Sequence, residues 1–253
     1  MFDFSVNDRV ATITMRNKPV NALTLEFVKQ LELLVDDLES RDDWNTLIIR
    51  SNLKVFSAGG DLAGMLSWMN EEGAAKRVAS YAQRIQQLMT RFEKLPGVTI
   101  AFIEGAALGG GLELALSCDL RIATEAAKFG LPELKVGLLP AAGGTQRLTR
   151  HCGRGVATRI MLAGDVLSAA EAHRVNLVEM LWENGQSRIE LADIAGRIAA
   201  MPREALIIVK DCIAGQGASD TDGFALEITG IEKLVAGGEA KIRIARFMQK
   251  TDA

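Results

Sequence analysis

Apolar and polar positions along this chain change from one period to another, and the change predicts strands interleaved with helices. Two short runs rich in β-branched residues, 10–15 (VATITM) and 46–50 (TLIIR), stand between polar segments and predict strands. After Thr24, a residue type that caps helices, apolar residues recur every three or four positions and predict a helix. The same spacing over 78–95 predicts a second helix.

A buried strand and a helical tail complete this outline. The run 98–103 (VTIAFI) is short, almost wholly apolar and bounded by turn residues, which predicts a fully buried strand. From about residue 186 onward the pattern is helical, with breaks predicted at Pro202, at 215–217 and at 237–238. Strand–helix alternation followed by a helical tail is typical of α/β units with a helical appendage.

Two short features have a structural interpretation. Ser168 and Glu171 have the spacing of a capping box, and Asn176 stands where that helix would end in a left-handed turn. Asp119, at the start of the strand-like run 119–123 (DLRIA), is expected to accept hydrogen bonds from backbone amides.

The composition indicates a folded chain without a basic surface for nucleic acid. Hydrophobic residues make up 48% and charged residues 24% of the 253 residues, which favours one large domain with a small appendage. The 29 basic and 32 acidic residues give a net charge of −3, so nucleic acid is not an expected partner.

No membrane or secretory segment is expected either. The most apolar stretch contains Glu104, Glu113 and several glycines, which makes a membrane-spanning helix a poor interpretation. The first residues (MFDFSVNDR) have no cationic start followed by an apolar run. The three cysteines are odd in number and far apart, which favours a reduced, cytoplasmic protein.

Several common catalytic motifs are absent from the sequence. His151 and His173 are the only histidines, and neither stands in an HExxH motif or beside a metal-ligating partner, so no metal site is predicted. The sequence has no GxSxG nucleophile elbow, no GxxxxGK[ST] phosphate loop and no GxGxxG dinucleotide fingerprint. Any chemistry must then rest mainly on carboxylates and backbone amides.

Two glycine-bearing turns follow predicted strands, at 56–61 (FSAGGD) and at 104–113 (EGAALGGGLE). Glycine lets a backbone approach a ligand closely, and unpaired amides at a helix start bind anions. Taken singly, either turn is also typical of an ordinary strand-to-helix connection with tight packing. Asp61 is expected to lie in solvent or to cap a helix.

Two carboxylates stand in apolar surroundings. Glu113 follows the glycine run in a helix expected to begin near Gly109, which places Gly110 and Glu113 on one face. Burial raises the pKa of a glutamate toward values that suit proton transfer near neutral pH. The alternative is that Glu113 reaches the surface or pairs with an arginine such as Arg121. Glu133 lies in another apolar segment and is equally interpretable as a charge at a helix start.

Four segments resemble one protein family, and the resemblance covers nearly the whole chain. They are 56–62 (FSAGGDL), 105–123 (GAALGGGLELALSCDLRIA), 129–148 (FGLPELKVGLLPAAGGTQRL) and 168–178 (SAAEAHRVNLV). These motifs resemble the enoyl-CoA hydratase/isomerase (crotonase) family. The resemblance implies an α/β fold in which residues 1–190 form a spiral of ββα units that binds and transforms acyl-CoA. It also implies that residues 191–253 form a helical region that builds homotrimers, or dimers of trimers, and closes the pocket.

The resemblance also implies the residues of the site. By motif position, the amides of Gly60 and Gly110 form an oxyanion hole for a thioester carbonyl, and Glu113 and Glu133 are the catalytic carboxylates. The residues implied to contact the CoA moiety of the acyl-CoA substrate are Asn21, Ala22, Leu23, Ala58, Gly59, Asp61 and Leu62. No metal or further cofactor is implied, since coenzyme A is part of the substrate.

Two carboxylates favour hydration of 2-trans-enoyl-CoA, in which one activates water for attack at Cβ and the other delivers a proton to Cα. The resemblance assigns Glu113 to the water and Glu133 to Cα, although in a coupled pair either group could be the acid. One alternative is a Δ3,Δ2-enoyl-CoA isomerase that uses Glu133 alone, because 18–27 (KPVNALTLEF) also resembles the isomerases. Others are a different acyl-CoA lyase of the family, and a scaffold or RNA-binding homologue whose basic residues would lie in 76–94.

Overall fold

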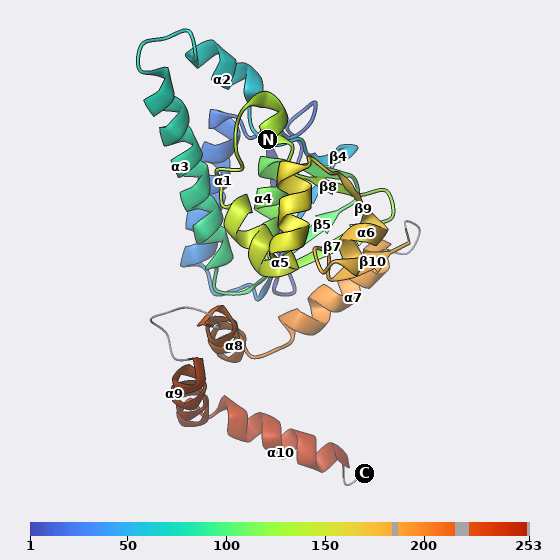
Figure 1. The fold of residues 1–253 in the computed structure, drawn as a ribbon. Helices are drawn as coiled ribbons and strands as arrows, with labels where there is room; N and C mark the ends of the chain where they lie inside the picture. The colour runs from blue at the N-terminus through green and yellow to red at the C-terminus, as the bar shows by residue number, and fades with distance from the viewer. Residues whose placement is uncertain (184–186, 216–222, 252–253) are drawn as a thin grey trace.

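The computed structural model describes residues 1–183, 187–215 and 223–251 (Figure 1). The strands are β1 (Phe2–Asn7), β2 (Val10–Met15), β3 (Thr46–Ser51), β4 (Val55–Ser57), β5 (Val98–Ile103), β6 (Ala106–Leu108), β7 (Leu120–Thr124), β8 (Lys128–Gly130), β9 (Leu167–Ser168) and β10 (Met180–Trp182). The helices are α1 (Leu25–Ser40), α2 (Leu62–Trp68), α3 (Ala74–Glu93), α4 (Gly110–Leu116), the 3₁₀ helix η1 (Glu133–Val136), α5 (Gly144–Leu162), α6 (Ala169–Arg174), α7 (Ser187–Ala199), α8 (Arg203–Gly215), α9 (Gly223–Ala236) and α10 (Glu239–Thr251).

The strands form two sheets. The larger has the order β1-β2-β3-β5-β7-β10, in which β1 pairs antiparallel with β2 and the later neighbours pair in parallel. The smaller has the order β4-β6-β8-β9, and its last pair is antiparallel. A strand of the larger sheet, a short strand of the smaller sheet and a helix follow one another three times: β3-β4-α2, β5-β6-α4 and β7-β8-η1. The predicted spiral of ββα units is therefore confirmed.

The longer helices follow the sequence pattern closely. The hydroxyl of Thr24 accepts a hydrogen bond from Phe27 N at 3.1 Å and caps α1. α3 packs beside α1, and the ion pair between Arg84 and Glu32 links them. α4 is buried along its whole length, from its first glycine to its last leucine, which places this helix at the centre of the molecule.

The sequence pattern missed most of the short strands. β4, β6, β8 and β9 are only two or three residues long, so they are too short to show an alternating pattern. β1 was also missed, although Phe2, Phe4 and Val6 occupy alternate positions, as the inward-facing residues of a strand do, and pack against the core. The capping box of Ser168 and Glu171 is confirmed at the start of α6.

The C-terminal helices leave the core in sequence order (Figure 1). α7 covers one face of the larger sheet, where Leu191 and Ile194 pack against Ile100 and its neighbours. The predicted helix breaks at Pro202 and 237–238 are confirmed. Of the break at 215–217, the first residue is the last of α8, and the other two lie outside the described residues. α9 and α10 lie away from the sheets, and apolar side chains such as Phe224 remain exposed.

One carboxylate fastens this region to the core. Asp119 Oδ2 accepts hydrogen bonds from Thr99 N at 2.7 Å and from Thr99 Oγ1 at 2.9 Å, as the sequence predicted for backbone amides. It also accepts one from Lys210 Nζ of α8 at 2.8 Å. None of the described helices is both long enough and apolar enough to cross a membrane.

Candidate active site

A cavity of about 590 Å³ opens between α3, the start of α4 and the segment 133–142. Gly60, Gly110, Glu113 and Glu133 all line it. The two glycine turns and the two carboxylates that the sequence singles out therefore meet in one place, although they come from three different segments of the chain.

The peptide unit that joins Gly59 and Gly60 is held with its amide toward the cavity. Gly59 O accepts a hydrogen bond from Leu23 N at 2.9 Å, and the C=O and N–H of a trans peptide point in opposite directions. Among the described residues, Gly60 N donates a hydrogen bond to no backbone carbonyl. It is thus a free donor whose direction is set by the carbonyl of the same peptide.

The peptide unit between Gly109 and Gly110 supplies a second donor at the start of α4. Gly109 O accepts a hydrogen bond from Glu113 N at 3.0 Å, which is the first bond of the helix. The amide of Gly110 therefore points away from the helix body, as the first amides of a helix do. Within the described part of the chain it has no backbone acceptor.

The two donors are close because no side chain separates them. A Cβ atom on Gly59 would lie 2.9 Å from Gly110 N and 2.8 Å from Leu108 O, closer than real Cβ atoms come. Gly59 also has a φ of 97°, in the left-handed region that favours glycine. The approach of the two turns therefore requires glycine at position 59.

Glu113 lies one helical turn after Gly110 and is 3% exposed. Its Oε1 accepts hydrogen bonds from Ala142 N and Gly144 N, both at 2.8 Å. Burial raises its pKa to about 7. The negative charge of Glu133 also raises the pKa, whereas the hydrogen bonds from the two backbone amides lower it. The alternative partner, Arg121, instead forms an ion pair with Glu179.

Glu133 is the first residue of η1, directly after Pro132. Its Oε2 is buried and has no hydrogen-bond partner among the described residues, and burial raises the pKa of this carboxyl as well. A Cβ atom on Gly109 would lie 2.9 Å from Glu133 Oε1, so the carboxylate reaches the turn that carries the second donor. Two glutamates with raised pKa values thus flank a pair of free amides.

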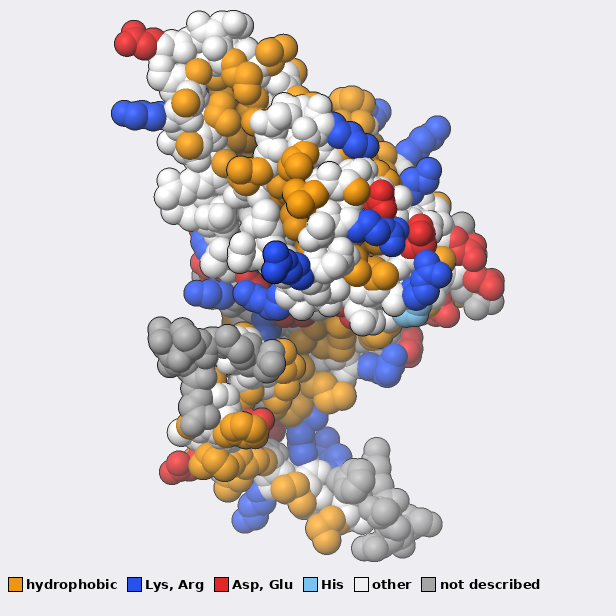
Figure 2. Space-filling view, in the orientation of Figure 1, with side chains coloured by type: hydrophobic (Ala, Val, Ile, Leu, Met, Phe, Trp, Pro, Cys, Tyr) orange, Lys and Arg blue, Asp and Glu red, His pale blue; other side chains and the backbone are white. Residues whose placement is uncertain are grey.

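The rest of the cavity is apolar. α2 and α3 form one side of it and the residues after Glu133 form the other; examples are Met65, Val78, Ala82, Ile85, Leu134 and Leu138. At the mouth, Leu62 is 52% and Val136 is 55% exposed. In the view of Figure 2, apolar side chains gather on the upper part of the molecule, where α2 and α3 lie. A concave apolar surface with a few convergent polar groups is typical of a small-molecule site.

The residues implied to contact the CoA moiety lie on the two segments that adjoin Gly60. Leu23 and Leu62 line the cavity, whereas the other five do not, namely Asn21, Ala22, Ala58, Gly59 and Asp61. The structure therefore brings two of the seven side chains to the cavity and gives two others a structural function.

Asn21 and Asp61 are these two structural residues. Asn21 is fully buried, and its side-chain amide donates to Ser51 Oγ at 2.8 Å and to Phe56 O at 2.9 Å. Asp61 caps α2 by accepting a hydrogen bond from Gly64 N at 3.0 Å, as one of the sequence interpretations proposed.

Two contributions to the site were missed from the sequence. The amides of Ala142 and Gly144 reach Glu113 from about thirty residues away in the chain, and the adjacent glycines of AAGGT were the only local signal. Tyr81 lines the cavity from α3, but its helical spacing indicated only a buried position.

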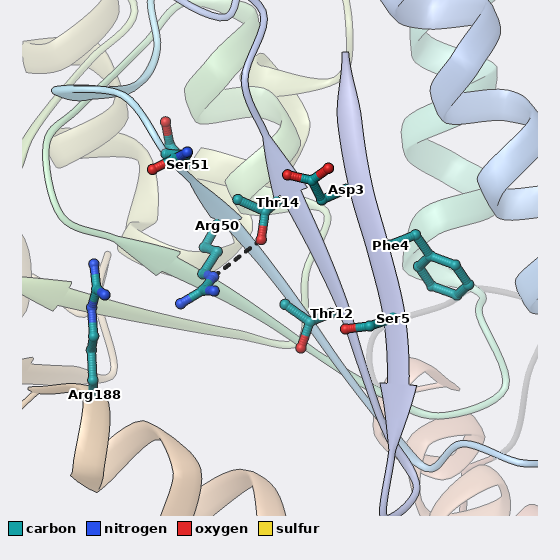
Figure 3. A pocket seen from close by; sticks show the side chains of 9 residues that line it. Asp3, Phe4, Ser5, Thr12, Thr14, Arg50, Ser51 and Arg188 are labelled. Carbon is teal, nitrogen blue, oxygen red and sulfur yellow. Dashed lines mark hydrogen bonds between the residues drawn. The ribbon is translucent and has the colours of Figure 1, made fainter.

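A second cavity, of about 360 Å³, lies beside β1, β2 and β3 (Figure 3). It is polar, and Arg50 Nε in it donates to Thr14 Oγ1 at 3.2 Å. The carboxylate in its wall, Asp3, is paired with Arg16. Among the described residues, no group of three His, Cys, Asp or Glu side chains is placed to hold a metal ion. The paired acids and free amides therefore mark the first cavity as the candidate active site.

Comparisons with known proteins find similarities over nearly the whole chain. The profile of the enoyl-CoA hydratase/isomerase family matches residues 5–252. A probable enoyl-CoA hydratase of Bacillus subtilis (strain 168) is 35% identical over 248 residues, which cover 97% of this chain and 95% of that protein. The solved structure of Pseudomonas aeruginosa DspI is similar with a TM-score of 0.88 at 32% identity, covering 98% of this chain and 94% of that one. The crystal structure of an enoyl-CoA hydratase from Geobacillus kaustophilus HTA426 has a TM-score of 0.91 at 29% identity, with the same coverage of 98% and 94%.

Replacing Glu113 by glutamine should stabilise the fold at alkaline pH. Because the pKa rises from 4.5 to about 7 on folding, the folded chain binds more protons between these values, and the free energy of unfolding falls as the pH rises through them. Glutamine keeps an oxygen for the two amides but carries no charge. At pH 8 the free energy of unfolding of Glu113→Gln should exceed that of wild type by at most about 3 kcal/mol, and this difference should be absent at pH 4.5.

Urea denaturation at the two pH values measures this gain. Glu125→Gln, a change at an exposed glutamate, is the matched control and should stay within about 0.5 kcal/mol of wild type at both. If Glu113→Gln changes the free energy of unfolding equally at both pH values, the raised pKa is wrong.

Proposed function

This chain belongs to the enoyl-CoA hydratase/isomerase family, and from that premise we propose that it adds water reversibly across the double bond of 2-trans-enoyl-CoA thioesters. The observation that carries the proposal is the meeting of two free peptide amides, the buried carboxylate of Glu113 and the half-buried carboxylate of Glu133 in one apolar cavity. Each of these groups has one task in the proposed reaction.

Gly60 N and Gly110 N bind the thioester oxygen in this proposal. Addition of water at Cβ puts negative charge on that oxygen in an enolate, and donors that are already oriented stabilise the charge as it develops. Loss of one such donor typically lowers the rate on the order of 10²–10³-fold. The hydrogen bonds to Gly59 O and Gly109 O support this assignment, because they orient both amides before any substrate binds.

Glu113 and Glu133 divide the proton transfers. Glu113 activates the water that attacks Cβ, and the amides of Ala142 and Gly144 fix the orientation of its carboxylate. Glu133 exchanges a proton with Cα, for which its buried, unpartnered Oε2 is suited. Since burial raises both pKa values, the pair can hold one proton between its members near neutral pH, as the addition requires.

The apolar part of the cavity holds the acyl tail. The wall contributed by α3 contains the small side chains of Ala75, Ala79 and Ala82, which leave width for a chain of methylenes. No metal or further cofactor takes part in this proposal, and the CoA moiety belongs to the substrate.

We also propose that residues 1–190 form the catalytic core and that residues 191–253 build a homotrimer, or a dimer of trimers, and close the pocket. The exposed apolar side chains of α8 to α10 support this division: Ile213, Phe224 and Ile228 are 70%, 82% and 68% exposed. Burying them against another copy would remove apolar surface from water. A location in the cytoplasm stays a prediction from cysteine usage.

Binding of RNA is less well supported. The basic residues of α3 were the sequence feature that favoured it, yet Arg77, Arg84 and Arg91 each form an ion pair with a glutamate. A paired guanidinium offers less charge to phosphate, which supplies most of the affinity for nucleic acid.

The hydratase proposal predicts that the protein consumes crotonyl-CoA, seen as loss of the absorbance of the conjugated thioester. Glu113→Gln and Glu133→Gln should each lower kcat about 10²–10⁴-fold, because each removes a proton-transfer group. Glu125→Gln is the control and should match wild type. Full activity in either active-site variant contradicts the two-carboxylate mechanism.

Activity on a 3-enoyl-CoA substrate distinguishes the second candidate function, that of a Δ3,Δ2-enoyl-CoA isomerase, from the hydratase. The buried and unpartnered Oε2 of Glu133 favours it, since an isomerase of this kind needs one base. Turnover that survives Glu113→Gln and is lost in Glu133→Gln identifies an isomerase. No turnover of 3-enoyl-CoA by wild type excludes it.

A change at Ala82 tests the position of the acyl tail. Ala82→Phe fills the apolar part of the cavity, so kcat/KM for a twelve-carbon enoyl-CoA should fall about 10-fold or more, while that for crotonyl-CoA changes little. Ser80→Phe places the same ring at an exposed position of α3 and is the control. Equal losses for short and long substrates would show that the tail lies elsewhere.

A further inference from the structure

Tyr81 is the single tyrosine of the chain, and it lies on α3 with 6% of its surface exposed. Its helical spacing marks it as an ordinary core residue. Its hydroxyl, however, lies between two backbone segments: it donates to Leu23 O and accepts from Asp61 N at 3.5 Å. Any buried phenol needs a hydrogen-bond partner, and what distinguishes Tyr81 is that its two partners are backbone groups of the segments beside Gly60.

These two segments are the ones that orient Gly60. A parallel bridge pairs Leu23 with Gly60, and on one side of it Leu23 N donates to Gly59 O at 2.9 Å. On the other side, the phenol of Tyr81 links Leu23 O to Asp61 N. The peptides before and after Gly60 are therefore both held, the first by Leu23 and the second by Tyr81.

We propose that Tyr81 is a positioning residue whose hydroxyl holds the pairing of Leu23 with Gly60 and thereby aims the amide of Gly60 at the thioester oxygen. Tyr81 acts through the backbone and touches no reacting atom. The inference rests on the proposed function for the reaction, but its geometric part requires only that a negatively charged oxygen bind at the amide of Gly60.

The surroundings of Tyr81 keep its hydroxyl in place. Trp68 contacts the ring edge-on with centroids 5.4 Å apart, and the guanidinium of Arg77 lies 4.8 Å from the ring centroid of Trp68. Burial raises the pKa of Tyr81 to about 12, so the phenol stays protonated and able to donate to Leu23 O. The ring is thus fixed by packing and the hydroxyl by its two backbone partners.

Tyr81→Phe keeps the ring and removes the hydroxyl. We expect it to lower kcat for crotonyl-CoA about 10-fold with KM within about threefold, because small displacements of a positioned group cost catalysis more than binding. The more direct readout is a ratio of dissociation constants. Acetoacetyl-CoA, which can bind as an enolate, should lose about 10-fold in affinity relative to butanoyl-CoA, which carries no negative charge on its acyl group.

Leu88→Val is the matched control for a loss of packing. Leu88 lies on the same helix, is 2% exposed and does not line the cavity. It should lower thermal stability without changing the ratio of the two dissociation constants. If Tyr81→Phe behaves like Leu88→Val in this respect, Tyr81 is a packing residue and the proposal is wrong.

A second measurement needs no variant. Because the chain has one tyrosine, biosynthetic incorporation of 3-fluorotyrosine labels only position 81. The ¹⁹F resonance should move more on binding acetoacetyl-CoA than on binding butanoyl-CoA, since the charge at the Gly60 amide changes the field at the linked phenol. An equal response to both ligands contradicts the proposal.

The two proposals can fail separately. Wild type that does not act on crotonyl-CoA overturns the hydratase proposal, while the ratio of dissociation constants and the ¹⁹F response still test Tyr81. Active wild type with an unchanged ratio in Tyr81→Phe overturns only the function of Tyr81.

Discussion

Two peptide planes, 59–60 and 109–110, are the constraint on which the rest of the site depends. Each has its carbonyl engaged inside the fold, by Leu23 N in one case and by Glu113 N in the other, so each amide is left free and directed. Glycine at 59 lets the two units approach to a distance that a Cβ atom would prevent. The ββα spiral supplies these planes by the same means twice, because β4 and β6 are each followed by a glycine turn that leads into a helix.

The two carboxylates have a cost for the fold that is consistent with a catalytic site. Glu113 is buried at the centre of the molecule, with a pKa displaced upward, and Glu133 has an oxygen without a partner. Both features oppose folding near neutral pH, and surrounding packing must offset them. Strongly perturbed acids that share one cavity are more typical of proton transfer than of structural support.

Much of this could be predicted from the sequence, because its signals are local. Thr24, the capping box at Ser168 and the apolar runs of β2, β3 and β5 are each specified by neighbouring residues, and the glycine turns and both glutamates stand out by their surroundings. The partners of Glu113 could not be predicted, since Ala142 and Gly144 contribute only backbone amides, which any residue type except proline carries. Asn21 was expected near the CoA moiety, yet its amide is used inside the fold, a distinction that needs the position of Phe56 O. Tyr81 could not be distinguished from core because its hydroxyl partners are also backbone atoms far along the chain.

The most direct test of the paired amides is the infrared frequency of the thioester carbonyl in a bound, ¹³C-labelled acyl-CoA. Two aligned donors should lower this frequency on binding to wild type. Gly59→Ala should abolish the shift, because its Cβ atom would press against Gly110 N. Gly73→Ala is the control, since Gly73 also has a positive φ, of 79°, but has no atom within 4 Å of an added Cβ, so it should keep the full shift. A carbonyl whose frequency is the same free and bound, or a full shift in Gly59→Ala, would contradict the account.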